Sequence, residues 1–321
     1  MKKIILDQLR KRGTVSGEAL GKAAGTSRTA VWKHIKDLRK EGYAIASSPR
    51  RGYSLIRSPD VLIPEEIEDG LSTHVLGRTI KYYHETPSTQ DMAKQIALTG
   101  SAEGTVAVAE TQTRGRGRMG RAWSSPPGGI YFSMILRPEL SPVEAPKIPL
   151  VVGVAVAEAI EKAAGLYPKL KWPNDILING KKIAGILAEM SAETDRVEWI
   201  VIGIGINVNT RRAAFPEELK TIATSLRAET GLSLKRVEIL QSILFEIENS
   251  YENFLTEGFE PIRRRWKELS HMIGANVTVT RGKQRVEGRA VDIDEGGALI
   301  LQRTGGDLQR ITFGDISFGT V

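Results

Sequence analysis

The chain has 321 residues, of which 41% are hydrophobic, and its formal net charge is +7. It contains no cysteine, which excludes disulfides, thiolate nucleophiles and iron-sulfur clusters, and its four histidines are scattered without the spacing of metal ligands. A chain of this length is typical of two or three domains. No apolar run reaches the length of a membrane span, so we expect a cytoplasmic protein with no membrane partner.

The basic excess is concentrated at the N-terminus. Residues 1–60 carry 14 Lys and Arg against 5 Asp and Glu, a net charge of +9. Residues 61–321 carry 31 against 33, a net charge of −2. This concentration is typical of a nucleic-acid-binding module attached to a body with a different role.

The pattern within residues 1–60 predicts a winged helix-turn-helix. Apolar spacing predicts helices around 4–9, over 17–24 and from Ser27 to about Arg39, with Ser16 and Ser27 as N-caps. Residues 43–46 and 52–55 alternate like the hairpin of a wing. The residues expected to face DNA are Ser27, Arg28, Thr29, Ala30, Lys33, Lys36, Arg50 and Arg51. The alternative is a basic three-helix domain that docks on protein or RNA.

A linker at about residues 57–64 leads to a predicted body over 65–272. Its expected helices are 64–70, 89–99 and 150–164. Its expected strands are 79–84, 104–109, 130–136, 170–172, 175–178, 182–190 and 198–205. Because helices and strands mix without strict alternation, we predict an α+β fold with a mixed, largely antiparallel sheet. Short strands and Gly-rich turns over 273–321 predict a small, SH3-like β-barrel.

An arginine-glycine loop, residues 114–121, has the sequence RGRGRMGR. Clustered arginines repel one another and glycine is costly to order, so this loop indicates an anionic ligand. The loop also matches G-x-G-x-x-G, but the prolines and glycines of 123–129 cannot open a helix. We therefore reject the dinucleotide fingerprint and predict a loop between two strands. A solvated basic loop that binds nothing is the alternative.

Three further segments combine polar groups in unusual places. ETPSTQ at 85–90 lies where a strand passes into a helix, and KWPND at 171–175 lies in a tight turn between strands. Two lysines at 181–182 follow an Asn-Gly turn, and alternation directs one of them inward. The structural alternatives are a helix cap, a plain Asn-Asp turn and a solvated lysine pair.

The order and content of these segments resemble the bifunctional biotin protein ligases that double as biotin operon repressors, over the whole chain. The most specific matches are 115–121 with Trp123, 171–175, Lys182 with 184–187, and IGIGINVN at 202–209. The resemblance implies that biotin and ATP, with Mg²⁺, are condensed to biotinyl-5′-adenylate, and that biotin is then transferred to a lysine on a carboxylase carrier domain. It also implies that the adenylate-loaded form dimerises and binds operator DNA.

The resemblance also implies roles for individual residues. Those implied to bind biotin are Ser88, Thr89, Gln90, Gln112, Gly115, Arg116, Gly117, Arg118 and Lys182. Those implied to bind ATP or the adenylate are Arg118, Arg121, Trp123, Asn174, Asp175, Lys182 and Asn207. Arg118 and Lys182 are the implied catalytic pair, and no protein ligand is assigned to the metal. Met119 stands where some relatives carry a further arginine, a departure that changes only the charge of the loop.

Physical logic agrees with this chemistry. A carboxylate and a triphosphate repel each other until cations neutralise them, so such a site needs positioning and charge rather than a nucleophile. Because the loop has no apolar anchor before Trp123, we predict that it is mobile in the free protein and orders over ligand. A ligand-sensing repressor without catalysis, and a lipoate or other acyl ligase, are the alternatives.

Overall fold

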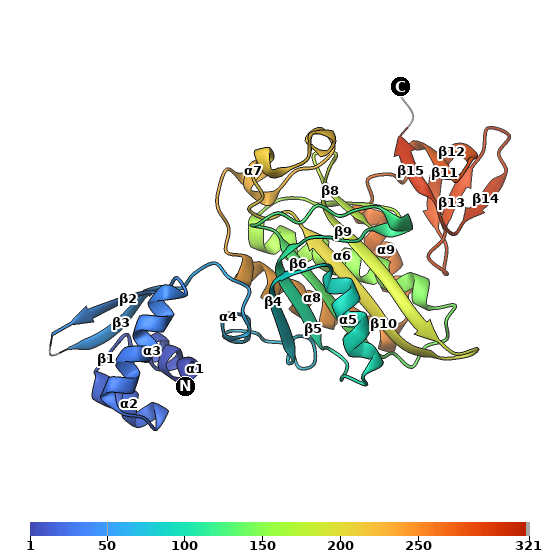
Figure 1. The fold of residues 1–321 in the computed structure, drawn as a ribbon. Coiled ribbons are helices and arrows are strands. Elements are labelled where there is room, and N and C mark those ends of the chain that lie inside the picture. Colours follow the sequence, from blue (N-terminus) through green and yellow to red (C-terminus); the bar gives the residue numbers. More distant parts are fainter. Residues whose placement is uncertain (50, 319–321) are drawn as a thin grey trace. The chain divides into compact units, whose positions relative to one another are not determined.

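The computed structural model describes residues 1–49 and 51–318 (Figure 1). The chain divides into two compact units, Met1–Val61 and Leu62–Val321. None of the described helices is long and apolar enough to cross a lipid bilayer.

The N-terminal unit consists of three helices and a three-stranded sheet of order β1-β3-β2. Its elements are α1 (Lys2–Arg12), β1 (Thr14–Val15), α2 (Gly17–Ala24), α3 (Arg28–Lys40), β2 (Ala44–Ser48) and β3 (Gly52–Arg57). The Oγ atoms of Ser16 and Ser27 accept hydrogen bonds from the third residue after each, at 3.1 and 3.2 Å, and so begin α2 and α3. The predicted winged helix-turn-helix is confirmed, and β1 is an addition to it.

The larger unit is built on a seven-stranded sheet of order β4-β5-β6-β10-β9-β8-β7. Its strands are β4 (Ile80–Thr86), β5 (Val106–Gln112), β6 (Ile130–Leu136), β7 (Lys169–Lys171), β8 (Asp175–Ile178), β9 (Lys181–Ala192) and β10 (Val197–Ile206). Only β4 and β5 pair in parallel, and every other neighbouring pair is antiparallel. The predicted α+β fold with a mixed sheet is confirmed.

Helices cover both faces of this sheet (Figure 1). On one face lies α5 (Thr89–Leu98), and on the other lie α6 (Ile148–Ala164), α8 (Arg236–Glu257) and α9 (Glu260–Leu269). Strand β5 shows how the alternation serves both layers. Val106 and Val108 belong to the main core under α6 and α8, whereas Ala107 belongs to the smaller core under α5.

The helices α7 (Leu226–Thr230), α8 and α9, and the short α4 (Pro64–Glu68), complete the unit. The sequence reading did not anticipate α7 to α9. The signal for α8 was present, because Ile239, Leu240, Ile243, Leu244 and Ile247 repeat at helical spacing and are all buried.

The C-terminal part is a five-stranded antiparallel sheet of order β14-β13-β12-β11-β15. Its strands are β11 (Asn276–Arg281), β12 (Gln284–Ile293), β13 (Leu299–Gln302), β14 (Leu308–Ile311) and β15 (Asp315–Phe318). The prediction of a barrel was wrong in one respect. Within the described residues β14 and β15 are opposite edges that do not pair, so the sheet does not close.

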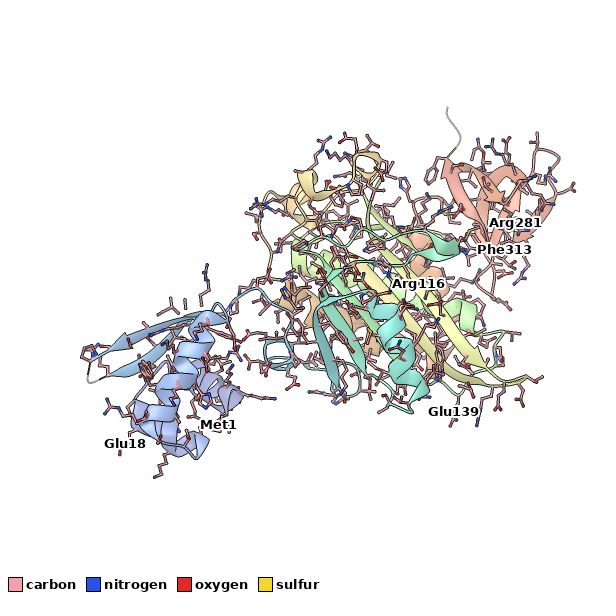
Figure 2. All side chains as sticks on the ribbon, in the orientation of Figure 1. Met1, Glu18, Arg116, Glu139, Arg281 and Phe313 are labelled. Atoms are coloured by element: carbon pink, nitrogen blue, oxygen red, sulfur yellow. The ribbon has the colours of Figure 1, made fainter. Side chains whose placement is uncertain are left out.

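The segment between β14 and β15 crosses the end of this sheet. There Arg281 Nε donates to the Phe313 carbonyl at 2.9 Å, and its guanidinium lies 4.5 Å from the Phe313 ring centroid (Figure 2). Trp172 connects the C-terminal sheet to the larger one, because its Nε1 donates to the carbonyl of Gly297 at 3.0 Å. Asp315 and Phe318 of β15 line a cavity of the larger unit.

Candidate active site

A cavity of about 520 Å³ in the larger unit gathers segments that are far apart in the sequence. The predicted site residues that line it are Ser88, Thr89, Gln90, Gln112, Arg116, Gly117, Arg118, Arg121, Trp123, Asn174, Asp175, Lys182 and Asn207. Gly115 does not line it. A Cβ at Gly115 would lie 2.4 Å from the carbonyl oxygen of Trp123, so this glycine permits the loop to close on itself.

One end of the cavity is a buried polar network. Thr89 donates to Gln112 Oε1 through its backbone N at 2.8 Å, and its Oγ1 lies 3.0 Å from the hydroxyl of Ser133. The Ser133 hydroxyl donates to Gln90 Oε1 at 3.2 Å, and Gln90 Nε2 donates to the carbonyl of Val201 at 3.2 Å. These bonds fix the side chains before any ligand arrives.

Ser88 precedes this network and differs from it. Ser88 is the N-cap residue of α5, yet its side chain makes no capping bond. Its Oγ is buried and, within the described part of the chain, has no hydrogen-bond partner. The same holds for Trp123 Nε1. Buried polar atoms without partners are costly, so both atoms indicate a polar ligand in the cavity.

Trp123 lies against the floor of the cavity because two glycines make room for its ring. A Cβ at Gly205 of β10 would lie 2.3 Å from Trp123 Nε1, and a Cβ at Gly185 of β9 would lie 2.9 Å from the ring. Gly203 does the same for Gln90, whose Oε1 would lie 2.4 Å from an added Cβ. The glycines within this apolar strand pair therefore shape the cavity.

The arginine-glycine loop is a small folded turn rather than an open coil. Gly117 N donates to the Arg121 carbonyl at 2.7 Å, and Trp123 N donates to the Gly115 carbonyl at 2.9 Å. Met119, at the tip, has a φ of 55°, a left-handed backbone conformation that residues other than glycine rarely adopt. The loop joins β5 to β6, as predicted, and its ordering on ligand binding stays a prediction.

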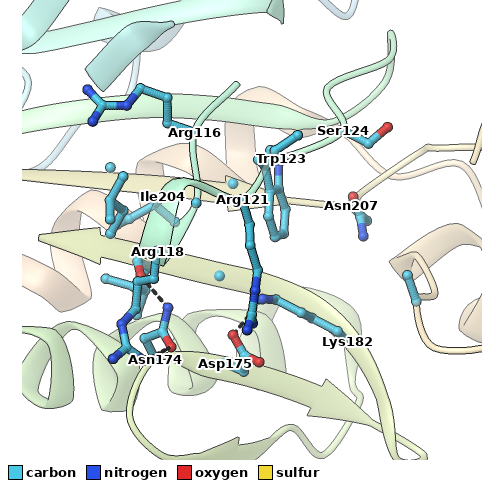
Figure 3. Close-up of a pocket in the computed structure, with 18 of the residues that line it drawn as sticks. Arg116, Arg118, Arg121, Trp123, Ser124, Asn174, Asp175, Lys182, Ile204 and Asn207 are labelled. Carbon is cyan, nitrogen blue, oxygen red and sulfur yellow. Dashed lines mark hydrogen bonds and ion pairs between the residues drawn. The ribbon is translucent and has the colours of Figure 1, made fainter. Parts of the chain in front are cut away.

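The arginines of the loop point in different directions (Figure 3). The Arg116 guanidinium donates to Asp91 at 2.5 Å and to Glu189 at 3.1 Å, and its hydrogen bond to Asp91 raises its pKa. Its charge is therefore already balanced on the α5 side of the loop. Arg121 forms a two-point ion pair with Asp315 of β15.

Arg118 has no carboxylate partner among the described residues. Its guanidinium donates to the amide oxygen of Asn174 at 3.2 Å, and Asn174 in turn donates to the Ile186 carbonyl at 2.6 Å. Burial lowers the pKa of Arg118, although the nearby carboxylates of Asp315 and Asp175 oppose that effect. A partly desolvated cation held by a neutral amide is prepared to receive an anion.

Lys182 is the lysine that alternation directs toward the cavity. Its Nζ lies 2.5 Å from Asp175 Oδ1 and 5.2 Å from the centroid of the Trp123 ring. Lys182 therefore lies beside the Trp123 ring, for which Gly185 and Gly205 make room. Asn207, directly after β10, is buried and lines the same cavity.

Several residues that line this site were not assigned from the sequence, and four of them bear on its chemistry. Ser133 completes the polar network, Lys171 lies within the KWPND segment, and Asp315 and Phe318 come from β15. Asp315 is 194 residues from its partner Arg121. No local pattern relates residues that only the tertiary fold brings together.

The predicted DNA-facing surface lies on α3 and the wing. Its residues Ser27, Arg28, Thr29, Lys33, Lys36 and Arg51 are exposed, Ala30 is half-buried, and Arg50 lies outside the described residues. The sequence reading missed Trp32, which is 52% exposed beside these lysines and carries Lys36 Nζ 5.4 Å from its ring centroid. The surface is basic and contains one large aromatic ring.

Three known protein families match successive regions of the chain. Residues 2–54 match an HTH domain, residues 82–207 the Biotin/lipoate A/B protein ligase family, and residues 272–319 the Biotin protein ligase C terminal domain. The order of these matches is the order of the winged helix, the cavity and the C-terminal sheet.

Relatives cover almost the whole chain. The bifunctional ligase/repressor BirA of Bacillus subtilis is 45% identical over 306 residues, which are 95% of this chain and 94% of that protein. The corresponding protein of Escherichia coli is 35% identical, over 90% of this chain and 88% of its own length.

Solved structures agree with these matches. Biotin protein ligase from Aquifex aeolicus in complex with biotin and ATP is 33% identical, with a TM-score of 0.66, over 76% of this chain and all of that one. The chain therefore belongs to the biotin protein ligases, and within them to the bifunctional ligase/repressors that carry an N-terminal HTH domain.

Proposed function

We propose that this protein joins biotin to ATP, forming biotinyl-5′-adenylate, and transfers the biotinyl group to a lysine of a carboxylase carrier domain. The main observation in support of this proposal is the composition of the cavity. Within the part of the chain that the structure describes, Ser88 and Trp123 carry buried polar atoms without hydrogen-bond partners, and Arg118 and Lys171 are cations without carboxylate partners. Such a cavity suits a ligand with a polar ring system at one end and phosphates at the other.

The polar end of the cavity is assigned to biotin. Ser88 Oγ is free to hydrogen-bond the ring system, and the Thr89, Gln90 and Gln112 network fixes the shape around it. The residues proposed to bind biotin are Ser88, Thr89, Gln90, Gln112, Arg116, Gly117, Arg118 and Lys182, and Gly115, which does not line the cavity, contributes by letting the loop fold. The guanidinium of Arg116 acts indirectly, because its pairs with Asp91 and Glu189 hold the loop in place.

The charged end is assigned to the nucleotide, through Arg118, Arg121, Trp123, Asn174, Asp175, Lys182 and Asn207. A carboxylate oxygen of biotin attacks the α-phosphorus, the bond to the bridging oxygen breaks, and the electron pair leaves with diphosphate. Lys182 and Arg118 reduce the repulsion between the two anions and stabilise the charge that builds up on the α-phosphate. Asp175 is an oxygen donor suited to the Mg²⁺ that accompanies ATP, and the metal would neutralise phosphate charge there.

The loop is assigned to retention of the adenylate. The contact of Arg118 with Asn174 closes the loop over the cavity, which would limit access of water to the mixed anhydride. In the second step the neutral amine of the carrier lysine attacks the acyl carbon, an amide bond forms as the nitrogen loses one proton to solvent, and AMP leaves with the electrons of the acyl-oxygen bond.

The N-terminal unit is assigned to operator DNA. The exposed cations of α3 and the wing are placed for base and phosphate contacts, and an adenylate-loaded homodimer would present two such units to a two-fold site. We infer three working parts: residues 1–60 for DNA, 65–272 for biotin and ATP, and 273–321 for a C-terminal part that supplies Asp315 to the cavity.

Incubation of the protein with ATP, Mg²⁺ and a carrier domain tests the activity. With biotin, the mass of the carrier should rise by one biotinyl group. With lipoate in its place, no gain is expected. A gain only with lipoate would identify a lipoate ligase, and no gain with either acid would leave a sensing repressor without catalysis.

A further inference from the structure

We propose that Lys171 binds the β- and γ-phosphates of ATP and the diphosphate that leaves, an assignment that rests on the proposed function. Five cationic side chains line the cavity: Arg116, Arg118, Arg121, Lys171 and Lys182. They differ in what balances their charge, and that difference carries the inference.

Three of the five are paired with carboxylates. Arg116 pairs with Asp91 and Glu189, Arg121 with Asp315, and Lys182 with Asp175 at 2.5 Å. Across the described chain Lys171, like Arg118, forms no ion pair. The nearest recorded contact of its Nζ is the face of the Phe318 ring, 5.7 Å to the centroid. An aromatic face balances a cation only in part.

Lys171 is also half-buried, so water does not fully replace the missing partner. Burial lowers its pKa, against the opposing attraction of Asp175. Arg118, the other unpaired cation, is lowered for the same reason. Among the five cations of the cavity, the two without a carboxylate partner in the described chain are therefore the two that an incoming anion would stabilise most.

The position of Lys171 fits the outer phosphates. In the β7–β8 hairpin Lys171 lies directly opposite Asp175, the partner of Lys182. Its ring contact, Phe318, lies on β15 with Asp315, the partner of Arg121. Lys171 therefore lies near the carboxylates of both ion pairs of the nucleotide end. Lysine is a compact charge that suits phosphate oxygens without fixed geometry.

In the proposed reaction the leaving diphosphate gains charge as the bond from the α-phosphorus to the bridging oxygen breaks. Lys171 remains an ammonium throughout and transfers no proton. Its role is to bind the outer phosphates before the reaction and to stabilise the extra charge on the leaving group.

The test separates the two half-reactions in Lys171→Met. Isotope exchange between diphosphate and ATP, in the presence of biotin, measures the first. Transfer from supplied biotinyl-5′-adenylate to a carrier domain measures the second. We expect the KM for ATP and the Kd for diphosphate to rise about 10-fold or more, the scale of one hydrogen bond to a charged group. Transfer from supplied adenylate should change by less than about 2-fold because no diphosphate is then involved.

Two further variants complete the design. Lys171→Arg should recover part of the diphosphate affinity. Lys169→Met removes the same charge from an exposed position of β7 that does not line the cavity, and it should leave both half-reactions unchanged. Equal losses in exchange and transfer by Lys171→Met would indicate a structural role and overturn the assignment, as would unchanged exchange.

Direct binding of inorganic diphosphate, measured by calorimetry on the parent and on Lys171→Met, does not depend on catalysis. Weaker binding by the variant supports the assignment even if the parent proves inactive with biotin, an outcome that would refute only the proposed function. Equal binding by the two proteins refutes the role of Lys171.

Discussion

The N-terminal unit and the cavity position their proposed binding residues in opposite ways. In the N-terminal unit, the proposed contacts come from one helix and one hairpin within 1–61, and among the described residues all of them but the half-buried Ala30 are exposed. In the cavity, the groups that meet come from segments as distant as Arg121 and Asp315. A local surface can be changed one residue at a time, whereas an assembled cavity should respond to changes in residues that touch no ligand.

The largest effect should come from the assembled site, in Lys182→Met. Loss of this charge beside the α-phosphate should reduce kcat of adenylation on the order of 100- to 1000-fold. Lys181→Met is the matched control, because Lys181 is the preceding residue of the strand and does not line the cavity. Single-turnover formation of adenylate measures both. Equal activity of the two variants would contradict the role of Lys182.

The next effect concerns retention rather than formation of the intermediate. Arg118→Gly removes the contact with Asn174 that closes the loop and should let biotinyl-5′-adenylate dissociate roughly 10- to 100-fold faster. Release of labelled adenylate from the loaded protein, followed by filtration, gives the rate. If the variant retains the adenylate as firmly as the parent, the proposed function of the loop is wrong.

A substitution at Gly205, which lies against the Trp123 ring, tests how the cavity is assembled. In Gly205→Ala the added Cβ would overlap the Trp123 indole, so the ring must move. We expect roughly 1–3 kcal/mol of destabilisation and a higher KM for biotin. Gly231→Ala is not a suitable control, because Gly231 has a φ of 75°. Ala184→Gly, on the neighbouring strand, lowers stability without moving Trp123, and denaturant unfolding together with biotin kinetics separates the two effects.

The smallest effect should come from the local surface. Lys33→Ala should weaken operator binding without altering adenylation and should reduce the slope of log affinity against log salt by about 1. Lys40→Ala, in the last turn of α3, removes the same charge away from the N-terminal face of the helix and should change the slope less. Fluorescence anisotropy at several salt concentrations measures both. Identical slopes would place the DNA contact elsewhere.

The sequence determined a great deal of the secondary structure by itself. The periodicity of Val31, Ile35 and Leu38 and the caps at Ser16 and Ser27 are local, so α2 and α3 could be predicted to within a residue, whereas α1 is longer than expected and β1 was not predicted. The loop between β5 and β6 and the existence of strands β9 and β10 followed in the same way from turn residues and apolar runs. The separate segments of the site could be named because their composition is unusual.

Only the tertiary structure decided how those segments meet. The pairing of Arg116 with Asp91 and Glu189, and of Arg121 with Asp315, distinguishes balanced charges from unbalanced ones, and no spacing in the chain encodes that distinction. The open edges of the C-terminal sheet were equally beyond local reading, because closure depends on whether β14 and β15 meet. Short-range hydrogen bonding and periodicity determine elements, but charge balance and cavity shape depend on long-range packing.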